Sequence, residues 1–336
     1  MKLLPKILLS VGCIVGLSAC GNQTEDPALS PRNSVRITPQ NMNTVIMNAI
    51  EIYRAHGELP IRVGDLSVAV SEGGLVIRPS SDKLTCSGDG FNDEISGVGD
   101  KSNAFAYTFD ECQAEVIDPQ NYNLLSGYVI MKDILGSSGV CDDFRGEFSY
   151  RDMELTKIRN GEVSYLLGQI NGSYSFRHLT RDSDSDGICD FRSTVISGDS
   201  FTFELNGEQI EESLFSSTDE YDANVDTYHI SLNSYINSDS LNGQYRLATL
   251  RPLVGLRNNL YPLRGKFDLI GAGVTQVTVE VLSGDYLDYQ AVKLDMDINP
   301  ADGKPDNATS LYISWCELVE GEACELLQED ATQVQP

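Results

Sequence analysis

Residues 277–298 have the sequence VTVEVLSGDYLDYQAVKLDMDI, and this stretch decides the fold class. Apolar side chains occupy every second position of residues 277–281 and again of residues 292–298, with polar or charged side chains between them. A Ser-Gly-Asp sequence, typical of turns, stands at 283–285. A strand with one apolar and one charged face is typical of an antiparallel sheet with one side in water. The stretch therefore predicts two strands of such a sheet.

The same alternation occurs at residues 201–205 and 230–232, and turn sequences recur at Asn160-Gly161 and Asn206-Gly207. No second long helical pattern is present, so units in which helices alternate with strands are not expected. We predict a mainly β protein, built as an antiparallel meander of hairpins that forms a sandwich or an open barrel-like sheet. The predicted β regions are residues 58–214, with an acidic turn loop, and 224–327, which continue the same body; a tail follows at 328–336.

A short unit of aliphatic, polar, glycine, polar and aromatic residues recurs at irregular intervals. It is complete at residues 170–174, 241–245 and 263–267, and partly present at 145–148. A glycine at the start of a strand favours a bulge or a bend. We therefore expect each unit to begin a strand and to turn its aromatic ring toward the core.

One amphipathic helix is predicted at residues 37–57. Thr38 is the expected N-cap and Pro39 the expected first helical residue. Apolar side chains from Met42 to Tyr53 follow at intervals of three and four, which places them on one face. Gly57 ends the pattern. This face is expected to pack on the β body.

The composition is strongly acidic. The 336 residues include 50 Asp and Glu against 24 Lys and Arg, which gives a formal net charge of −26. Such a surface repels the phosphates of nucleic acids and anionic lipid headgroups, so a basic-patch binder of either is excluded. Hydrophobic residues make up 41% of the chain, enough for a buried core.

The N-terminus has the pattern of an export signal. Lys2 and Lys6 precede an apolar run over residues 7–17, which is too short to span a bilayer as a stable helix. The run ends in Leu17-Ser18-Ala19-Cys20. This sequence resembles the lipobox of bacterial lipoproteins. The alternative is an ordinary secretory signal with a chance cysteine.

The resemblance implies that residues 1–19 are a signal peptide, that Cys20 becomes the acylated first residue, and that fatty acids such as palmitate anchor it to a membrane. In that family an Asp after the cysteine marks retention at the inner membrane, and Gly21 stands here instead. The implied location is therefore the outer membrane, on its periplasmic or its surface side. Residues 20–36 are polar and are expected to form a flexible tether.

Six cysteines remain after Cys13 in the signal and Cys20 are set aside. An even number in an exported chain indicates disulfides. The least entangled of the 15 pairings joins neighbours along the chain. A zinc site is the alternative, but there is no C-x-x-C and the three histidines are scattered. The predicted pairs are Cys86–Cys112, Cys141–Cys189 and Cys316–Cys324.

The best candidate for a metal site is the acidic sequence DSDSDGICD at residues 182–190. Alternating aspartates on a tight loop with Gly at the sixth position are typical ligands of Ca²⁺. An EF-hand requires Glu at the twelfth position, which is Ser193 here, so the loop resembles the short calcium loops of extracellular β proteins more closely. A solvated Asp-Gly hairpin turn is the alternative. The candidate calcium ligands are Asp182, Asp184, Asp186 and Asp190.

Residues 292–318 resemble the closing segment of uncharacterised β-rich bacterial outer-membrane lipoproteins, where an alternating strand leads to an acidic turn and a strand with a Trp. This resemblance implies a similar fold and no activity. Motifs of hydrolases, metalloproteases and nucleotide-binding enzymes are absent from the sequence. We therefore expect an outer-membrane lipoprotein that is not an enzyme, with a structural or binding role toward a protein or glycan. The alternatives are a calcium-stabilised surface adhesin or glycan-binding protein and, with less support, an envelope hydrolase.

Overall fold

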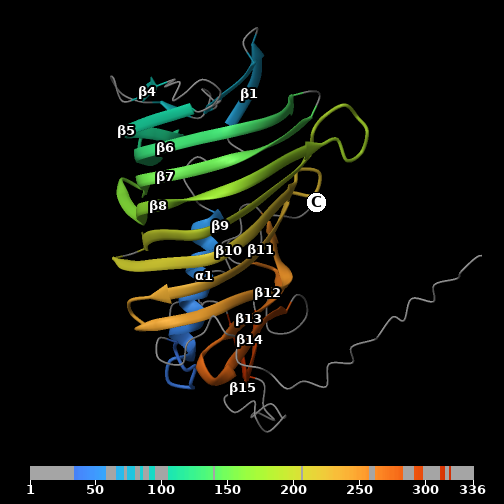
Figure 1. Cartoon of the computed structure of the whole chain (residues 1–336). Coiled ribbons are helices and arrows are strands. Elements are labelled where there is room, and N and C mark those ends of the chain that lie inside the picture. Colours follow the sequence, from blue (N-terminus) through green and yellow to red (C-terminus); the bar gives the residue numbers. More distant parts are fainter. Residues whose placement is uncertain are drawn as a thin grey trace, which may run out of the picture.

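The computed structural model describes residues 34–57, 66–71, 74–79, 84–85, 91–94, 105–138, 141–205, 207–256, 262–282, 291–297, 311–314 and 318. One α-helix, α1 (Met42–Gly57), precedes the strands (Figure 1). The strands are β1 (Leu66–Ser71), β2 (Gly74–Pro79), β3 (Leu84–Thr85), β4 (Phe91–Glu94), β5 (Phe105–Asp118), β6 (Asn121–Ser138), β7 (Asp142–Arg159), β8 (Glu162–Arg181), β9 (Phe191–Leu205), β10 (Glu208–Asp222), β11 (Thr227–Ser238), β12 (Gly243–Leu256), β13 (Arg264–Ile270), β14 (Gln276–Leu282), β15 (Ala291–Asp297) and β16 (Leu311–Ser314).

The predicted antiparallel meander is confirmed. From β5 to β16 each strand pairs antiparallel with the next strand of the chain, within one sheet of 14 described strands. The sheet is open, with β3 and β16 at the two ends of the described order, so the sandwich that we considered is not formed. β1 and β2 form a separate two-stranded sheet. β10 includes residues 215–222, which the prediction had left between its two β regions.

A two-residue turn connects β7 and β8, as the sequence predicted. Asn160 and Gly161 have φ angles of 54° and 78°, which is the left-handed pair that a type I′ hairpin turn requires. Gly207, after β9, also has a positive φ of 83°. Asn206 and residues 283–285 lie outside the described residues.

A series of bulges runs across the middle of the sheet. Five strands each contain a residue with positive φ at the point where the pairing register shifts. They are the consecutive strands β5, β6, β7 and β8, and β10, which is separated from β8 by β9. A bulge bends its strand and increases the local twist. The sheet is accordingly strongly twisted, and α1 lies across one face of it (Figure 1). The five residues are Glu111, Gly127, Asp152, Gln169 and Leu214.

The bulges also change which positions of a strand face the core. On β7, Phe148 and Tyr150 are buried before the bulge at Asp152, and Met153 and Leu155 are buried after it. The buried positions therefore change from even to odd numbers within one strand. Because the extra residue absorbs this change, the same face of the sheet stays apolar along the whole strand.

Helix α1 packs with its apolar face on the strands β9 to β13. Val45, Ile46 and Ala49 are fully buried, and the ring of Tyr53 lies 5.4 Å from that of Phe267 on β13. The helix begins at Met42 rather than at residue 37. Thr38 lies one turn earlier: its carbonyl accepts from Met42 N–H at 2.9 Å and its N–H donates to Asn41 Oδ1 at 2.8 Å, as in a capping box, so residues 38–41 form the turn that leads into the helix.

The last residues of the predicted tether belong to the body instead. Val35 is buried, its N–H donates to the Gln244 carbonyl at 2.9 Å, and its own carbonyl accepts from Ala272 N–H at 2.7 Å. Ser34 forms a parallel bridge with Gln244. Any flexible segment therefore ends before residue 34. Residues 1–33, with Cys20, lie outside the described residues.

The aromatic residues of the recurring glycine unit face the core, as expected. Phe148, Tyr174, Tyr245 and Phe267 are all at most 4% exposed. The expected place in the strand is right for two units, since Gly243 begins β12 and Gly265 is the second residue of β13. It is wrong for Gly146 and Gly172, which lie inside the long strands β7 and β8.

No helix in the described part of the chain is long and apolar enough to cross a membrane.

Candidate functional site

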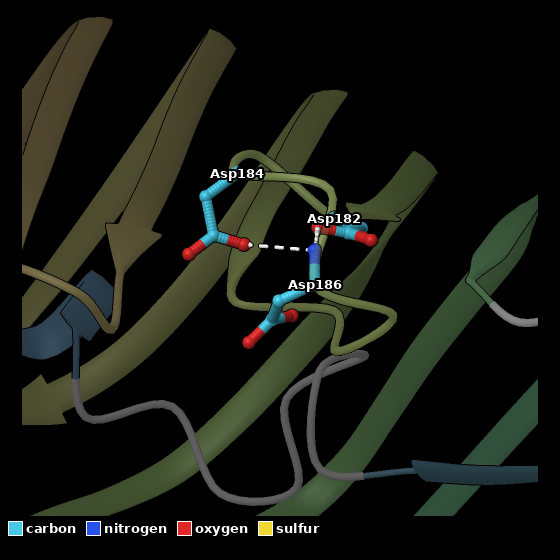
Figure 2. A group of neighbouring side chains, drawn as sticks. All are labelled: Asp182, Asp184 and Asp186. Carbon is cyan, nitrogen blue, oxygen red and sulfur yellow. Dashed lines mark hydrogen bonds between the residues drawn. The ribbon is translucent and has the colours of Figure 1, made fainter.

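The acidic loop of residues 182–190 connects β8 to β9 and stands out from the edge where these strands end. Its first three aspartates are brought together, because carboxylate oxygens of Asp182, Asp184 and Asp186 all lie within 4.8 Å of one another (Figure 2). Ser185 and Gly187 have φ angles of 68° and 91°, so two left-handed residues make the tight turn. This grouping agrees with the spacing from which we predicted a calcium site.

Backbone N–H groups of the loop fix the orientation of these carboxylates. Asp182 accepts from the N–H groups of Ser185 at 2.6 Å and Gly187 at 2.7 Å, through different oxygens. Asp184 accepts from Asp186 N–H at 3.2 Å, as Figure 2 shows. A carboxylate oxygen has more than one acceptor position, so these bonds leave capacity to bind a cation.

Asp190, the fourth predicted ligand, lies outside this group of three. Its carboxylate accepts from both the N–H and the hydroxyl of Ser183, at 2.8 and 2.7 Å, and from the side-chain amide of Asn224. These hydrogen bonds, led by that from the Ser183 hydroxyl, lower the pKa of the Asp190 carboxyl. Asp190 therefore closes the base of the loop and ties it to the β10–β11 turn.

The surroundings of the group act on the carboxyl of Asp184. Partial desolvation and the charges of Asp186, Asp190 and Asp182 raise the pKa of the Asp184 carboxyl, and the hydrogen bond from Asp186 opposes this effect. A divalent cation would remove the repulsion and favour the charged carboxylates. The donor set of three carboxylates supplies the oxygen ligands that Ca²⁺ prefers.

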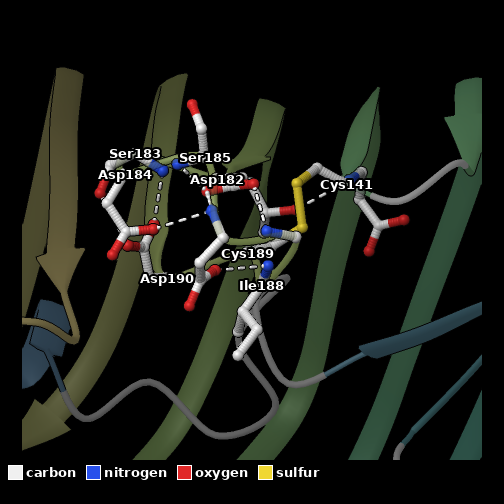
Figure 3. Close-up of a disulfide and its surroundings, with 12 residues drawn as sticks. Cys141, Asp182, Ser183, Asp184, Ser185, Ile188, Cys189 and Asp190 are labelled. Carbon is white, nitrogen blue, oxygen red and sulfur yellow. Dashed lines mark hydrogen bonds between the residues drawn. A yellow bond between two sulfur atoms is a disulfide. The ribbon is translucent and has the colours of Figure 1, made fainter.

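A disulfide holds the loop to the start of β7. Cys141 and Cys189 are bonded, with their Cα atoms 5.7 Å apart (Figure 3), and this is one of the three predicted pairs. Cys112 is also disulfide-bonded, to a partner outside the described residues. Cys86, Cys316 and Cys324 lie outside these residues too, so the other two pairings stay predictions.

A buried polar cluster between α1 and the sheet was missed by the sequence reasoning. His56 Nε2 lies 2.6 Å from Glu212 Oε2, and both side chains are almost fully buried. The rings of Phe201 and Phe215 lie 6.3 and 5.9 Å from the imidazole. One feature of the sequence could have indicated the cluster. Glu212 stands two residues after the buried Ile210 on the same strand, so it occupies a position that faces the core.

The cluster extends along the helix to a second group. The Tyr245 hydroxyl donates to Asn48 Oδ1 at 2.5 Å. Burial, with the charges of Glu212 and Glu208, raises the pKa of the Tyr245 phenol well above its usual value, so the phenol stays a donor at neutral pH. The cluster therefore positions α1 by polar contacts as well as by apolar packing.

Comparison with known proteins gives no relative: no protein-family model, curated protein or solved structure matches this chain.

Proposed function

We propose that the protein is a lipid-anchored component of the bacterial outer membrane with a non-catalytic binding role. The lipobox-like sequence that ends at Cys20 supports the anchor. The disulfide between Cys141 and Cys189 fits an oxidising compartment, where such bonds persist. The segment from Cys20 to Ser34 spans at most roughly 50 Å when fully extended, so the body would stay close to the membrane surface.

The observation that carries the binding role is the polar face of the sheet. β7 and β8 are 18 and 20 residues long, and on both strands exposed polar side chains alternate with buried ones. One face of the sheet therefore packs in the core, and the other is a long polar surface available to a partner.

The hydrolase alternative needs two carboxylates that face one reacting bond. Glu147, an acidic residue on the polar face, is instead engaged by Lys132, whose Nζ lies 2.5 Å from Glu147 Oε2.

The anchor is tested by replacing its cysteine. In cells grown with radiolabelled palmitate, the wild-type protein is expected to take up label and Cys20→Ser to take up none, because the serine oxygen is not the acceptor of the lipoprotein pathway. In detergent partitioning, the processed wild-type protein is expected in the detergent phase. Cys13→Ser is the matched control, since it changes the other cysteine of the signal. Equal labelling of Cys20→Ser and wild type would remove the lipoprotein proposal.

We further propose that Ca²⁺ binds the acidic loop and stabilises the fold. The convergence of three carboxylates within 4.8 Å supports this. With three carboxylates and no Glu at the twelfth position, we expect weak affinity, with Kd about 10⁻⁴–10⁻³ M as in extracellular modules. The ion would act as a structural brace at the edge of the body rather than as a catalytic group.

The calcium proposal predicts a higher melting temperature with Ca²⁺ than with chelator. At about 10 mM Ca²⁺ the gain is about 1.4–2.7 kcal/mol for that range of Kd. This corresponds to a few degrees in Tm, measured at matched ionic strength because the net charge makes stability sensitive to salt.

Two variants decide whether the loop is responsible. Asp184→Asn with Asp186→Asn is expected to abolish the shift, and Asp239→Asn, in the β11–β12 turn, is expected to keep it. A shift of wild-type size in the double variant would leave the loop as a solvated turn.

A further inference from the structure

A groove opens on the polar face of the sheet where the pairing of β8 and β9 is interrupted. Gly172 pairs with Phe201 and Ser175 with Ser197, but the residues between them, two on β8 and three on β9, have no partner in the ladder. A hollow of about 900 Å³ lies here, lined by residues of β7, β8, β9 and β10. Its volume is within the range of sites for small molecules.

Two glycines at the groove allow rings and backbone to approach closely. Gly172 has a φ of 138°, and a Cβ there would lie 2.8 Å from both the Ser200 carbonyl oxygen and the Phe201 ring. A Cβ on Gly198 would lie 2.6 Å from the Phe215 ring and 2.7 Å from the Ser173 carbonyl oxygen. The buried rings of Phe201 and Phe215 therefore occupy the space that a side chain would fill.

The lining is rich in groups that hydrogen-bond to hydroxyls. Four serines contribute hydroxyl groups, each of which can donate and accept. Thr202 donates to the Asn171 carbonyl, and the Asn171 amide is held by Asp152 and Gln169. Glu147 and Asp199 add carboxylates, and Leu214, 63% exposed, adds an apolar contact. The hydroxyl and amide residues are Ser173, Ser175, Ser197, Ser200, Thr202 and Asn171.

We propose that this groove binds a neutral or N-acetylated glycan chain, which deepens the proposed binding role and rests on it. A sugar presents many hydroxyls and some apolar C–H surface, which matches the serine hydroxyls, the Asp199 carboxylate and Leu214. Among the described residues that line the groove there is no lysine or arginine, and Lys132 beside it pairs with Glu147, so the carboxylate of Asp199 disfavours phosphorylated or acidic ligands.

A bound peptide fits less well. Extended peptides commonly bind by adding a strand to a free sheet edge. The groove lies over β8 and β9, which are interior strands paired on both sides, so their backbones offer no such edge. A ligand there must be recognised through side chains and the short unpaired stretch, as a sugar would be.

The test is a titration of the full-length protein, in a detergent without a sugar headgroup, with chitotetraose, cellotetraose and maltotetraose. Calorimetry is expected to detect binding of at least one probe. Asp199→Ala with Ser197→Ala is expected to weaken that binding at least tenfold, since hydrogen bonds from sugar hydroxyls to a carboxylate are lost. Glu154→Ala, on β7 outside the groove, is the matched control and is expected to bind like wild type.

The outcomes separate this inference from the proposed function. Absence of binding to all three probes, or undiminished affinity in a folded Asp199→Ala/Ser197→Ala variant, would overturn the glycan site but leave the lipid anchor intact. Cleavage of a bound probe would support the ligand class and overturn the non-catalytic role. Circular dichroism melting of each variant shows that a loss of binding is not a loss of fold.

Discussion

His56→Ala is expected to lower the free energy of unfolding by about 3–5 kcal/mol, one of the largest effects of any single substitution in this protein. The change leaves the Glu212 carboxylate inside the protein, 0% exposed, without the imidazole 2.6 Å away. Water cannot replace that partner without opening the contact between α1 and β10. The measurement is the midpoint of denaturant unfolding at neutral pH.

We attribute the loss of stability in His56→Ala to the free-energy cost of burying the Glu212 carboxylate without a partner. A double variant tests this explanation. Replacing both residues, His56→Leu with Glu212→Leu, removes the polar pair together and is expected to recover most of the lost stability. Among the described residues, His56 Nδ1 and Glu212 Oε1 already have no hydrogen-bond partner, so the pair is not fully satisfied even in the native protein.

His229→Ala is the control for the loss of a histidine, because His229 is half-buried on β11. A small effect of His56→Ala, similar to that of the control, would contradict the buried contact. A double variant less stable than His56→Ala would show that packing, and not the unpaired charge, is limiting.

Loss of the Cys141–Cys189 disulfide is the second large effect. The bond joins residues 48 positions apart, and the chain-entropy model gives about 4 kcal/mol for a loop of this length. Cys141→Ser with Cys189→Ser is therefore expected to lower the free energy of unfolding by about this amount. Denaturant unfolding without reductant measures it, since a reductant would also break the bond of Cys112.

The native structure of this double variant is expected to change only locally. The ladder between β7 and β8 does not depend on the bond, and Asp190 still accepts from Ser183 and Asn224. Faster hydrogen exchange is expected near residue 141 and in the loop of residues 182–190, and not in the sheet. An unchanged unfolding midpoint would mean that the bond adds no constraint to the unfolded chain.

Local sequence determined much of this architecture. The alternation at 277–281 and 292–297 predicted β14 and β15, because neighbouring side chains of a strand point to opposite faces whatever lies around it. Asn160-Gly161 predicted its hairpin turn, since both residues tolerate positive φ. The apolar stripe predicted α1, and the spacing of Asp182, Asp184 and Asp186 was enough to bring three carboxylates together.

Tertiary structure decided the rest. The bulge at Asp152 changes the buried positions of β7 from even to odd, so no single alternation marks that strand, and only the neighbouring strands fix where the extra residue goes. Alternation of apolar and polar residues also indicates which face of a strand is buried, but not whether a helix or a second sheet packs on that face. The sequence therefore did not distinguish one open sheet from a sandwich. His56 and Glu212 are 156 residues apart, and the groove combines four strands. Such contacts form only when the whole sheet is assembled around the helix. They cannot be predicted from local sequence, because the residues next to a position in the chain do not indicate which distant residues it will contact.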